Sequence, residues 1–220
     1  MASIHCKCGE VQIKFTSQAP VVAVECCDKL AFNNIKFLAY MGKYDFPNKF
    51  PVLVYYFENK LDVVKGFEKL TFNKVIEESN MVNMCTTCCH TFLSSQNLTF
   101  AQSTVMVHGD RSRLTNIFHQ PPILRFFSNQ LSTEEREQLV HVIPDLNRDA
   151  KNRIRGDRDG WEEIYSEFLR LVSAPISEDR EGLSFEEIFE RVGEPVFVFG
   201  WQSTRFSRKT VAYNECVLRN

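Results

Sequence analysis

The cysteines of this 220-residue chain are the residues whose types and spacing point most directly to chemistry. Two cysteines separated by one or two residues can lie on one tight turn, so that both thiolates face the same ion. Because the cytosol keeps thiols reduced, clustered cysteines there indicate metal binding or catalysis rather than disulfides. Seven of the eight cysteines are clustered and Cys216 stands alone; the clusters are Cys6 with Cys8, Cys26 with Cys27, and Cys85 with Cys88 and Cys89.

Two of these clusters predict a structural zinc site. The segments Cys6-Lys-Cys8-Gly9 and Cys85-Thr-Thr-Cys88 bring two thiolates each, and four thiolates close a tetrahedral shell around Zn²⁺ at about 2.3 Å per bond. Gly9 suits a turn in which the backbone curls so that its amides face the sulfurs. A closed shell of this kind has no open position for a substrate. The alternative is that these cysteines are small buried hydrophobic residues.

The first 120 residues must position these clusters, and they read as β-rich. Short apolar or alternating segments separated by turns are typical of strands in a small sandwich or rolled sheet. The expected strands cover residues 11–15, 21–24, 52–57, 61–65, 67–75 and 104–108.

After Pro121-Pro122 the pattern changes to a mixture of helices and loops. Ser132 with Glu135 predicts a capped helix start, and Ser184 with Glu187 predicts another. We expect helices over 161–172 and 183–192, an exposed loop over 147–160 and a strand over 195–200. The fold class is therefore mainly β with added helices (α+β), with a β domain at 1–120 and an extension at 121–220. The extension is expected to pack on the β domain or on a second subunit, so that a homodimer is one of the arrangements considered.

Composition and charge exclude several classes of protein. The chain has 26 Lys and Arg against 28 Asp and Glu, so it lacks the basic excess that nucleic-acid binding requires. Apolar runs are only a few residues long, so we expect no membrane span. The start, Met-Ala-Ser-Ile-His-Cys, has neither a basic nor a hydrophobic signal region, and we therefore expect a cytoplasmic location.

Several of these motifs also match a known family. The segment His5-Cys6-Lys-Cys8-Gly9-Glu-Val11 resembles the opening of glutathione-dependent formaldehyde-activating enzymes and the related centromere-protein-V domains, Cys-x-Cys-Gly-x-Val followed by a strand. The resemblance continues through residues 61–70 and ends at residues 84–92, so it covers about half of the chain. It implies an Mss4-like β fold, a structural zinc at Cys6, Cys8, Cys85 and Cys88, and lyase chemistry that forms or breaks a carbon–sulfur bond with glutathione.

The chain departs from the family at the second, catalytic metal site, which is a Cys-x-Cys-x-x-Cys pattern. Cys26 falls on the middle cysteine, whereas Val24 and Lys29 take the outer positions. One thiolate cannot hold zinc, so the pattern of a second catalytic ion is broken. In one interpretation a changed metal site is built from Cys26 or Cys27 with Cys89, His90 or Glu25.

In the other interpretation the pocket works without a second metal. Cys26 or Cys27, with a pKa lowered by Lys29, acts as nucleophile or acid–base group, and His90 shuttles protons. We interpret His108 as a strand-end surface or capping residue and the arginines around Arg148 as part of a solvated loop. The pair Phe126-Phe127 could roof a pocket for an aromatic substrate, but we interpret it as core.

The leading functional hypothesis is a zinc-containing lyase acting on a small organic substrate in a cleft between the β domain and the extension. The substrate is a specialised metabolite or a glutathione-thiol adduct, and the reaction is carbon–sulfur bond chemistry, elimination, decarboxylation or rearrangement. The alternative is a non-catalytic zinc-stapled scaffold whose extension binds a protein partner. Lys29 separates the two, because an enzyme is favoured if Lys29 lines an enclosed pocket with a cysteine and His90.

Overall fold

The computed structural model describes residues 1–29, 33–43, 45, 50–74, 79–98, 103–109, 112–151, 153–176, 179–193 and 196–197. Cys216 lies outside these residues, as does most of the strand expected over 195–200. Across the described part of the chain the fold is mainly β with a few helices, which confirms the predicted fold class. The same residues contain no helix that is long and apolar enough to cross a membrane.

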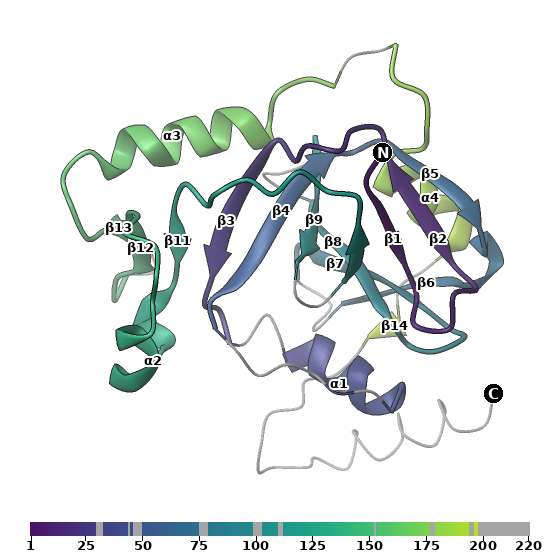
Figure 1. Ribbon diagram of the computed structural model, residues 1–220, viewed down its shortest axis with the longest axis horizontal. Coiled ribbons are helices and arrows are strands. Elements are labelled where there is room, and N and C mark those ends of the chain that lie inside the picture. Colours follow the sequence, from purple (N-terminus) through teal and green to yellow (C-terminus); the bar gives the residue numbers. More distant parts are fainter. Residues whose placement is uncertain are drawn as a thin grey trace.

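The larger of the two sheets holds ten strands among the described residues and runs across the whole molecule (Figure 1). Its parallel pairs are β12 with β11, β11 with β3, and β6 with β14, and its other pairs are antiparallel. Its order is β13 (Ile154–Gly156), β12 (Asp145–Arg148), β11 (Arg125–Phe126), β3 (Val22–Cys26), β4 (Val52–Glu58), β9 (Thr104–His108), β8 (Phe92–Asn97), β7 (Met81–Thr86), β6 (Leu70–Lys74) and β14 (Val196–Phe197).

A smaller antiparallel sheet lies beside it. Its four described strands are β10 (Arg113–Thr115), β1 (Ser3–His5), β2 (Gln12–Phe15) and β5 (Leu61–Lys65), in that order. The main core lies between the two sheets, where Ile4 and Phe15 of the small sheet meet Phe57 of β4. The rings of Phe15 and Phe57 stack with their centroids 4.3 Å apart.

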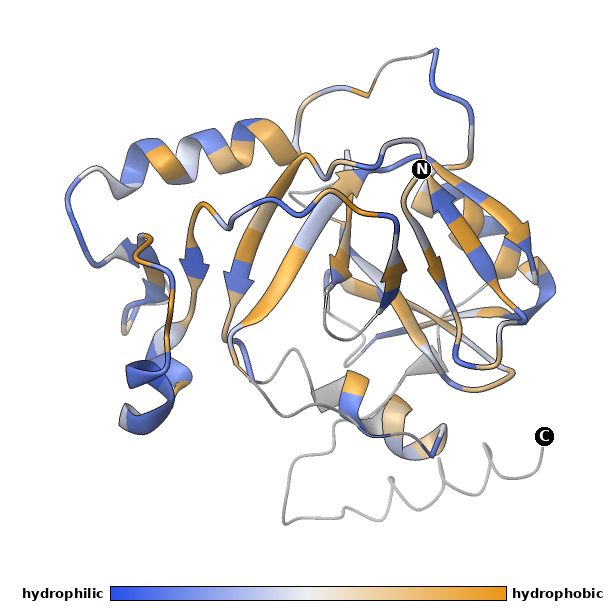
Figure 2. Ribbon diagram, viewed as in Figure 1, coloured by the Kyte–Doolittle hydropathy of each residue, from blue (hydrophilic) through white to orange (hydrophobic). Residues whose placement is uncertain are grey.

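The strands of the larger sheet alternate between two apolar faces. In β4, Tyr55 and Phe57 face the core between the sheets, whereas Val54 and Tyr56 face the opposite side. Figure 2 shows hydrophobic residues recurring along these strands. Because successive side chains of a strand point to opposite faces, both faces of this sheet need a cover.

Helices provide the second cover and extend the first core. The helix α3 (Trp161–Val172) packs on the Tyr56 face through Phe168, together with α1 (Asn33–Met41). The helix α4 (Phe185–Val192) adds Phe185 to the core between the sheets. The remaining helical segments are η1 (Phe67–Lys69), η2 (Ser128–Gln130) and α2 (Thr133–Glu137). Both predicted capping boxes are present, Ser132 with Glu135 and Ser184 with Glu187.

The residues after 120 join the larger sheet at both of its ends. Strands β11, β12 and β13 continue it beyond β3, and β14 pairs with β6 at the other end. The expected loop over 147–160 is wrong in part, because it includes the end of β12 and all of β13. The boundary at residue 120 stays a prediction.

Candidate functional site

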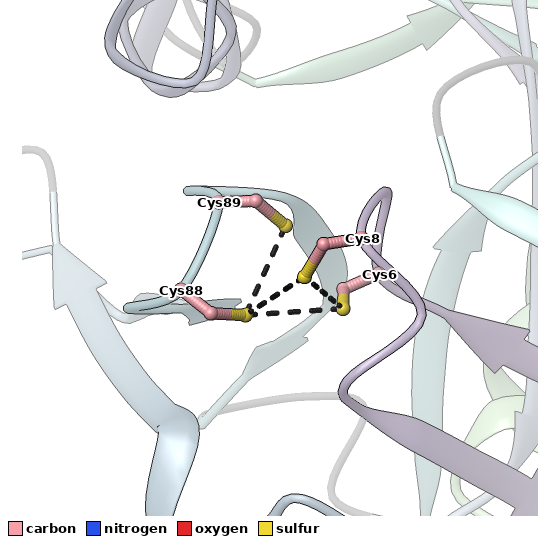
Figure 3. A group of neighbouring side chains, drawn as sticks. All are labelled: Cys6, Cys8, Cys88 and Cys89. Atoms are coloured by element: carbon pink, nitrogen blue, oxygen red, sulfur yellow. Dashed lines mark hydrogen bonds between the residues drawn. The ribbon is translucent and has the colours of Figure 1, made fainter.

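The turn between β1 and β2 meets the turn between β7 and β8 at a cluster of four cysteines, Cys6, Cys8, Cys88 and Cys89 (Figure 3). All four sulfurs lie within 4.8 Å of one another. The Sγ–Sγ separations are 3.4 Å for Cys6–Cys8 and Cys8–Cys88 and 3.9 Å for Cys6–Cys88. A tetrahedral site with metal–sulfur bonds of about 2.3 Å places its sulfurs about 3.8 Å apart. The cluster could therefore hold one metal ion.

Local hydrogen bonds shape the first turn around Cys6. The backbone N–H of Val11 donates to Cys6 Sγ at 3.2 Å, and Gly9, at φ 77°, donates its N–H to the Cys6 carbonyl at 3.0 Å. Glycine is favoured at such a left-handed position because it has no side chain to clash. An amide that points at a sulfur stabilises the negative charge of a metal-bound thiolate.

The second turn is tied to the first through Thr91. The backbone N–H of Lys7 donates to the Thr91 hydroxyl at 3.0 Å, and that hydroxyl lies 3.1 Å from Cys89 Sγ. The Thr91 side chain thus connects the two turns that carry the sulfurs.

Cys85, expected as the fourth ligand, is instead buried in strand β7. The Asn73 amide donates to its sulfur at 2.9 Å, and burial raises the pKa of Cys85 to about 12. A strand residue must follow the alternation of its sheet, and Cys85 faces the apolar cluster that contains Phe92. Cys89 lies in the turn, where no such alternation applies, and it takes the fourth place in the cluster.

The thiols of the cluster differ widely in acidity. Burial raises the pKa of Cys88 to about 12. Burial also raises the pKa of Cys89, but hydrogen bonds from Thr91 and the Cys8 backbone outweigh it and bring the value to about 5. Metal ligation requires thiolates, so binding an ion here releases protons from the remaining thiols.

A pocket of about 320 Å³ opens on the α3-covered face of the larger sheet. Its walls come from the strands β3, β4, β7, β8 and β9 and from the segments β11 to α3 that follow residue 120. The lining residues are Val24, Cys26, Asp28, Val54, Tyr56, Met81, Asn83, Ser95, Asn97, Met106, His108, Phe126, Phe127, Arg148, Ile154, Tyr165 and Phe168.

The polar groups of this pocket combine an imidazole, a carboxylate and neutral donors. His108 is 7% exposed, and its ring stacks on Phe92 with centroids 4.7 Å apart. Burial raises the pKa of Cys26 to about 12 and also raises the pKa of Tyr165. The thiol and the phenol are therefore protonated at neutral pH, so Cys26 is not the thiolate that a nucleophilic role requires.

The structure places the four predicted catalytic residues in different environments. Cys26 lines the pocket, whereas Cys27 is buried on the other side of β3 beside the ion pair of Glu25 and Arg125. Burial raises the pKa of the Cys27 thiol. Lys29 forms a 2.7 Å ion pair with Glu135, and its side chain is 38% exposed.

His90 lies in the β7–β8 turn at φ 53°, next to the cysteine cluster, and does not line the pocket. The residues Cys26, Cys27, Lys29 and His90 are thus not brought together. A lowered cysteine pKa beside Lys29 is not found either.

Three parts of the pocket lie where the sequence favoured a surface or core role: His108, the Phe126-Phe127 pair and Arg148. Arg148 is exposed, as a solvated loop would require, but its guanidinium also lies 5.3 Å from the ring centre of Phe127 at the pocket wall. The alternation of the strand over 104–108 was the available signal for His108, because it puts His108 on the same face as the apolar Met106.

Comparisons with known proteins identify no family for this chain. No family model matches it, and no curated protein matches it. Among solved structures, the crystal structure of a Rhodobacter sphaeroides protein aligns over 50% of this chain and 85% of its own, at 16% identity and a TM-score of 0.31. A likeness at this level assigns neither a family nor a function.

Proposed function

We propose that the protein is a zinc-containing, lyase-type enzyme related to the glutathione-dependent formaldehyde-activating enzymes, acting on a small organic substrate in the 320 Å³ pocket. The observation that carries this proposal is the pocket lining. It combines the imidazole of His108, the carboxylate of Asp28 and the neutral thiol of Cys26 with apolar walls. Apolar pockets with a few convergent polar groups are the usual form of small-molecule sites.

Zinc has a structural role in this proposal. Four cysteine sulfurs are the donor set that Zn²⁺ prefers, and their separations suit its tetrahedral geometry. With all four positions taken by protein, the ion supplies stability and no reactive position. Catalysis is therefore assigned to the side chains of the pocket.

The chemistry that this lining supports is elimination next to a carbonyl group. His108 removes the proton from the carbon next to the carbonyl, and that electron pair forms the new double bond. The carbon–sulfur bond breaks, its electron pair leaves with the sulfur, and His108 returns the proton to that sulfur. The thiol of Cys26 and the hydroxyl of Tyr165 donate hydrogen bonds to the substrate carbonyl as its negative charge grows.

A defined thioether substrate tests this assignment. The zinc-loaded chain is incubated with the adduct of glutathione and 4-phenyl-3-buten-2-one, and release of the enone is followed by its absorbance. S-hydroxymethylglutathione, from which His108 would remove the hydroxyl proton as formaldehyde forms and the protonated thiol leaves, is assayed in parallel by NMR. H108Q should lower kcat about 100-fold or more, since general-base catalysis contributes at least that factor.

The matched control is H119Q. His119 is exposed and contacts the Tyr55 hydroxyl at 2.9 Å, away from the pocket lining. If H108Q converts the substrate at the wild-type rate, the reaction does not take place in this pocket.

A zinc-stapled scaffold is the second candidate, and the position of Lys29 favours it. Lys29 pairs with Glu135 outside the pocket, rather than joining a cysteine and His90 in an enclosed site. In the scaffold, the extension binds a protein partner and the pocket has no turnover. It predicts that neither substrate is converted by the wild type.

A further inference from the structure

Aromatic rings from three elements form one side of the pocket. Tyr56 of β4 meets Phe168 of α3 edge-to-face with centroids 5.3 Å apart, and Phe126 of β11 meets Phe168 at 5.5 Å. Tyr165 lies one helical turn before Phe168 with its ring nearly parallel, at an angle of 15°. All four rings line the cavity. Aromatic rings prefer offset-stacked and edge-to-face neighbours, so this wall selects for another ring.

The volume of the pocket sets the size of that ligand. A dry apolar cavity of about 150 Å³ accommodates one benzene molecule. At about 320 Å³, this pocket has room for two fused rings with small substituents.

The part of the lining on β7 and β8 carries uncharged polar side chains. Asn83 and Ser95 face each other across the β7–β8 pair, and Asn97 lies one step along the same face opposite Met81. Amides and hydroxyls of this kind bond to neutral oxygens such as hydroxyl and carbonyl groups.

Charge complementarity argues against a strongly ionic occupant. Among the described lining residues the fixed charges are one carboxylate, Asp28, and one guanidinium, Arg148, so they cancel. Glutathione carries two carboxylates and an ammonium group, and one arginine at the wall cannot pair with both carboxylates. Of a glutathione thioether, therefore, only the neutral carbon skeleton would lie in the pocket, with the charged peptide outside it.

We propose that the substrate site takes a neutral, planar, two-ring aromatic compound that carries a hydroxyl or carbonyl oxygen. This inference rests on the proposed function in one respect, since it takes the same pocket as the substrate site. The aromatic wall holds the rings, and the Asn83–Ser95 wall holds an oxygen other than the carbonyl that Cys26 and Tyr165 contact in the proposed reaction.

Direct binding of a matched pair of probes tests the proposal. Calorimetry on the full zinc-loaded chain compares 2-naphthol with decahydro-2-naphthol, which has the same carbon skeleton and hydroxyl but no aromatic ring. We expect 2-naphthol to bind about 10-fold more tightly, the upper end of the gain from aromatic pairing.

Variants then place that binding in the pocket. F126L keeps an apolar side chain but removes a half-buried ring of the wall, and F168L removes a fully buried one. Each should weaken 2-naphthol binding several-fold and leave decahydro-2-naphthol unchanged. F185L is the control, because Phe185 is an equally buried helix residue in the core between the sheets. If F168L fails to fold, F126L with its partly exposed side chain still gives the result.

The outcomes separate this inference from the proposed function. Equal affinity for the two naphthols, or no 2-naphthol binding together with binding of glutathione, overturns the aromatic class even if the enzyme turns over thioethers. Selective binding that F126L weakens supports the class, and it does so even if no lyase turnover is found.

Discussion

At the cysteine cluster, Cys89 rather than Cys85 is the second cysteine near the β7–β8 turn that faces the other sulfurs. Cys88 and Cys89 face Cys6 and Cys8, whereas Cys85 is held by Asn73 within the sheet. C89S should therefore reduce the bound metal well below one ion per chain, and C85S should retain it. Metal content measured by mass spectrometry of the purified variants checks this. Retention by C89S together with loss in C85S would return Cys85 to the ligand set.

The carboxylate of Asp149 provides a second test at the level of one residue. Backbone N–H donation from Arg153, with help from the Arg153 guanidinium and the Lys151 N–H, lowers the pKa of Asp149 to about 2. A carboxylate whose pKa is lower in the folded chain stabilises the fold above its unfolded value of about 4. That stabilisation is lost as the pH falls through 2.

D149N should therefore unfold at a lower urea concentration than the wild type at pH 7. The difference between the two urea midpoints should narrow as the pH falls below about 4. D159N removes an exposed carboxylate from the same segment and corrects for the change in net charge. If the difference in urea midpoint between the wild type and D149N stays constant down to pH 3, these hydrogen bonds to the Asp149 carboxylate do not stabilise the fold.

Two helices with the same capping box differ in how much they bury. In both, a serine accepts from the backbone N–H of a glutamate three residues on. The helix α4 packs Phe185 and Ile188 into the core, whereas α2 has no buried residue. We expect S184A to lower the free energy of unfolding by about 1 kcal/mol.

S132A is the matched change in α2. It should lower the free energy of unfolding by less than S184A does, because α2 can open without exposing the core. Urea unfolding monitored by circular dichroism compares the two variants. An equal loss in both would show that packing of α4 does not couple its cap to global stability.

Local sequence patterns were sufficient to predict the helices at 161–172 and near residue 185. They also predicted most strands of the first half. Asn33–Met41 was not predicted as a helix, and its first turn has no acidic residue and its last turn no basic one. Strand β11 is two residues long and pairs with β3 from a hundred positions away, so no local pattern could reveal it. The place of Cys85 within β7 could not be predicted either, because the spacing of two thiols does not tell which of them lies in a strand.

For the whole molecule, the cysteine cluster links the two sheets. Cys6 and Cys8 lie in the β1–β2 turn of the small sheet, and Cys88 and Cys89 lie in the β7–β8 turn of the large one. Chelation of the metal under reducing conditions should lower the melting temperature by about 20 °C or more, since such sites contribute about 10 kcal/mol in small zinc domains.

Differential scanning calorimetry with and without a zinc chelator measures this shift. C89S is the control, because a chain that has already lost the metal should melt at the same temperature in both samples. An unchanged melting temperature in a wild-type sample shown to be metal-free would remove the structural role of the ion.

The pairing order of the strands also has a consequence for how the chain is made. Neighbours β6, β7, β8 and β9 pair in sequence order, so this meander can form as soon as residue 108 has left the ribosome. Strand β1 can pair with β10 only after residues 113–115 have been synthesised, and β3 can pair with β11 only after residues 125–126 have been synthesised. Contacts of such high sequence separation slow folding. Each N-terminal strand therefore has an open edge while about a hundred further residues are synthesised, and this interval is when the nascent chain is most prone to aggregate.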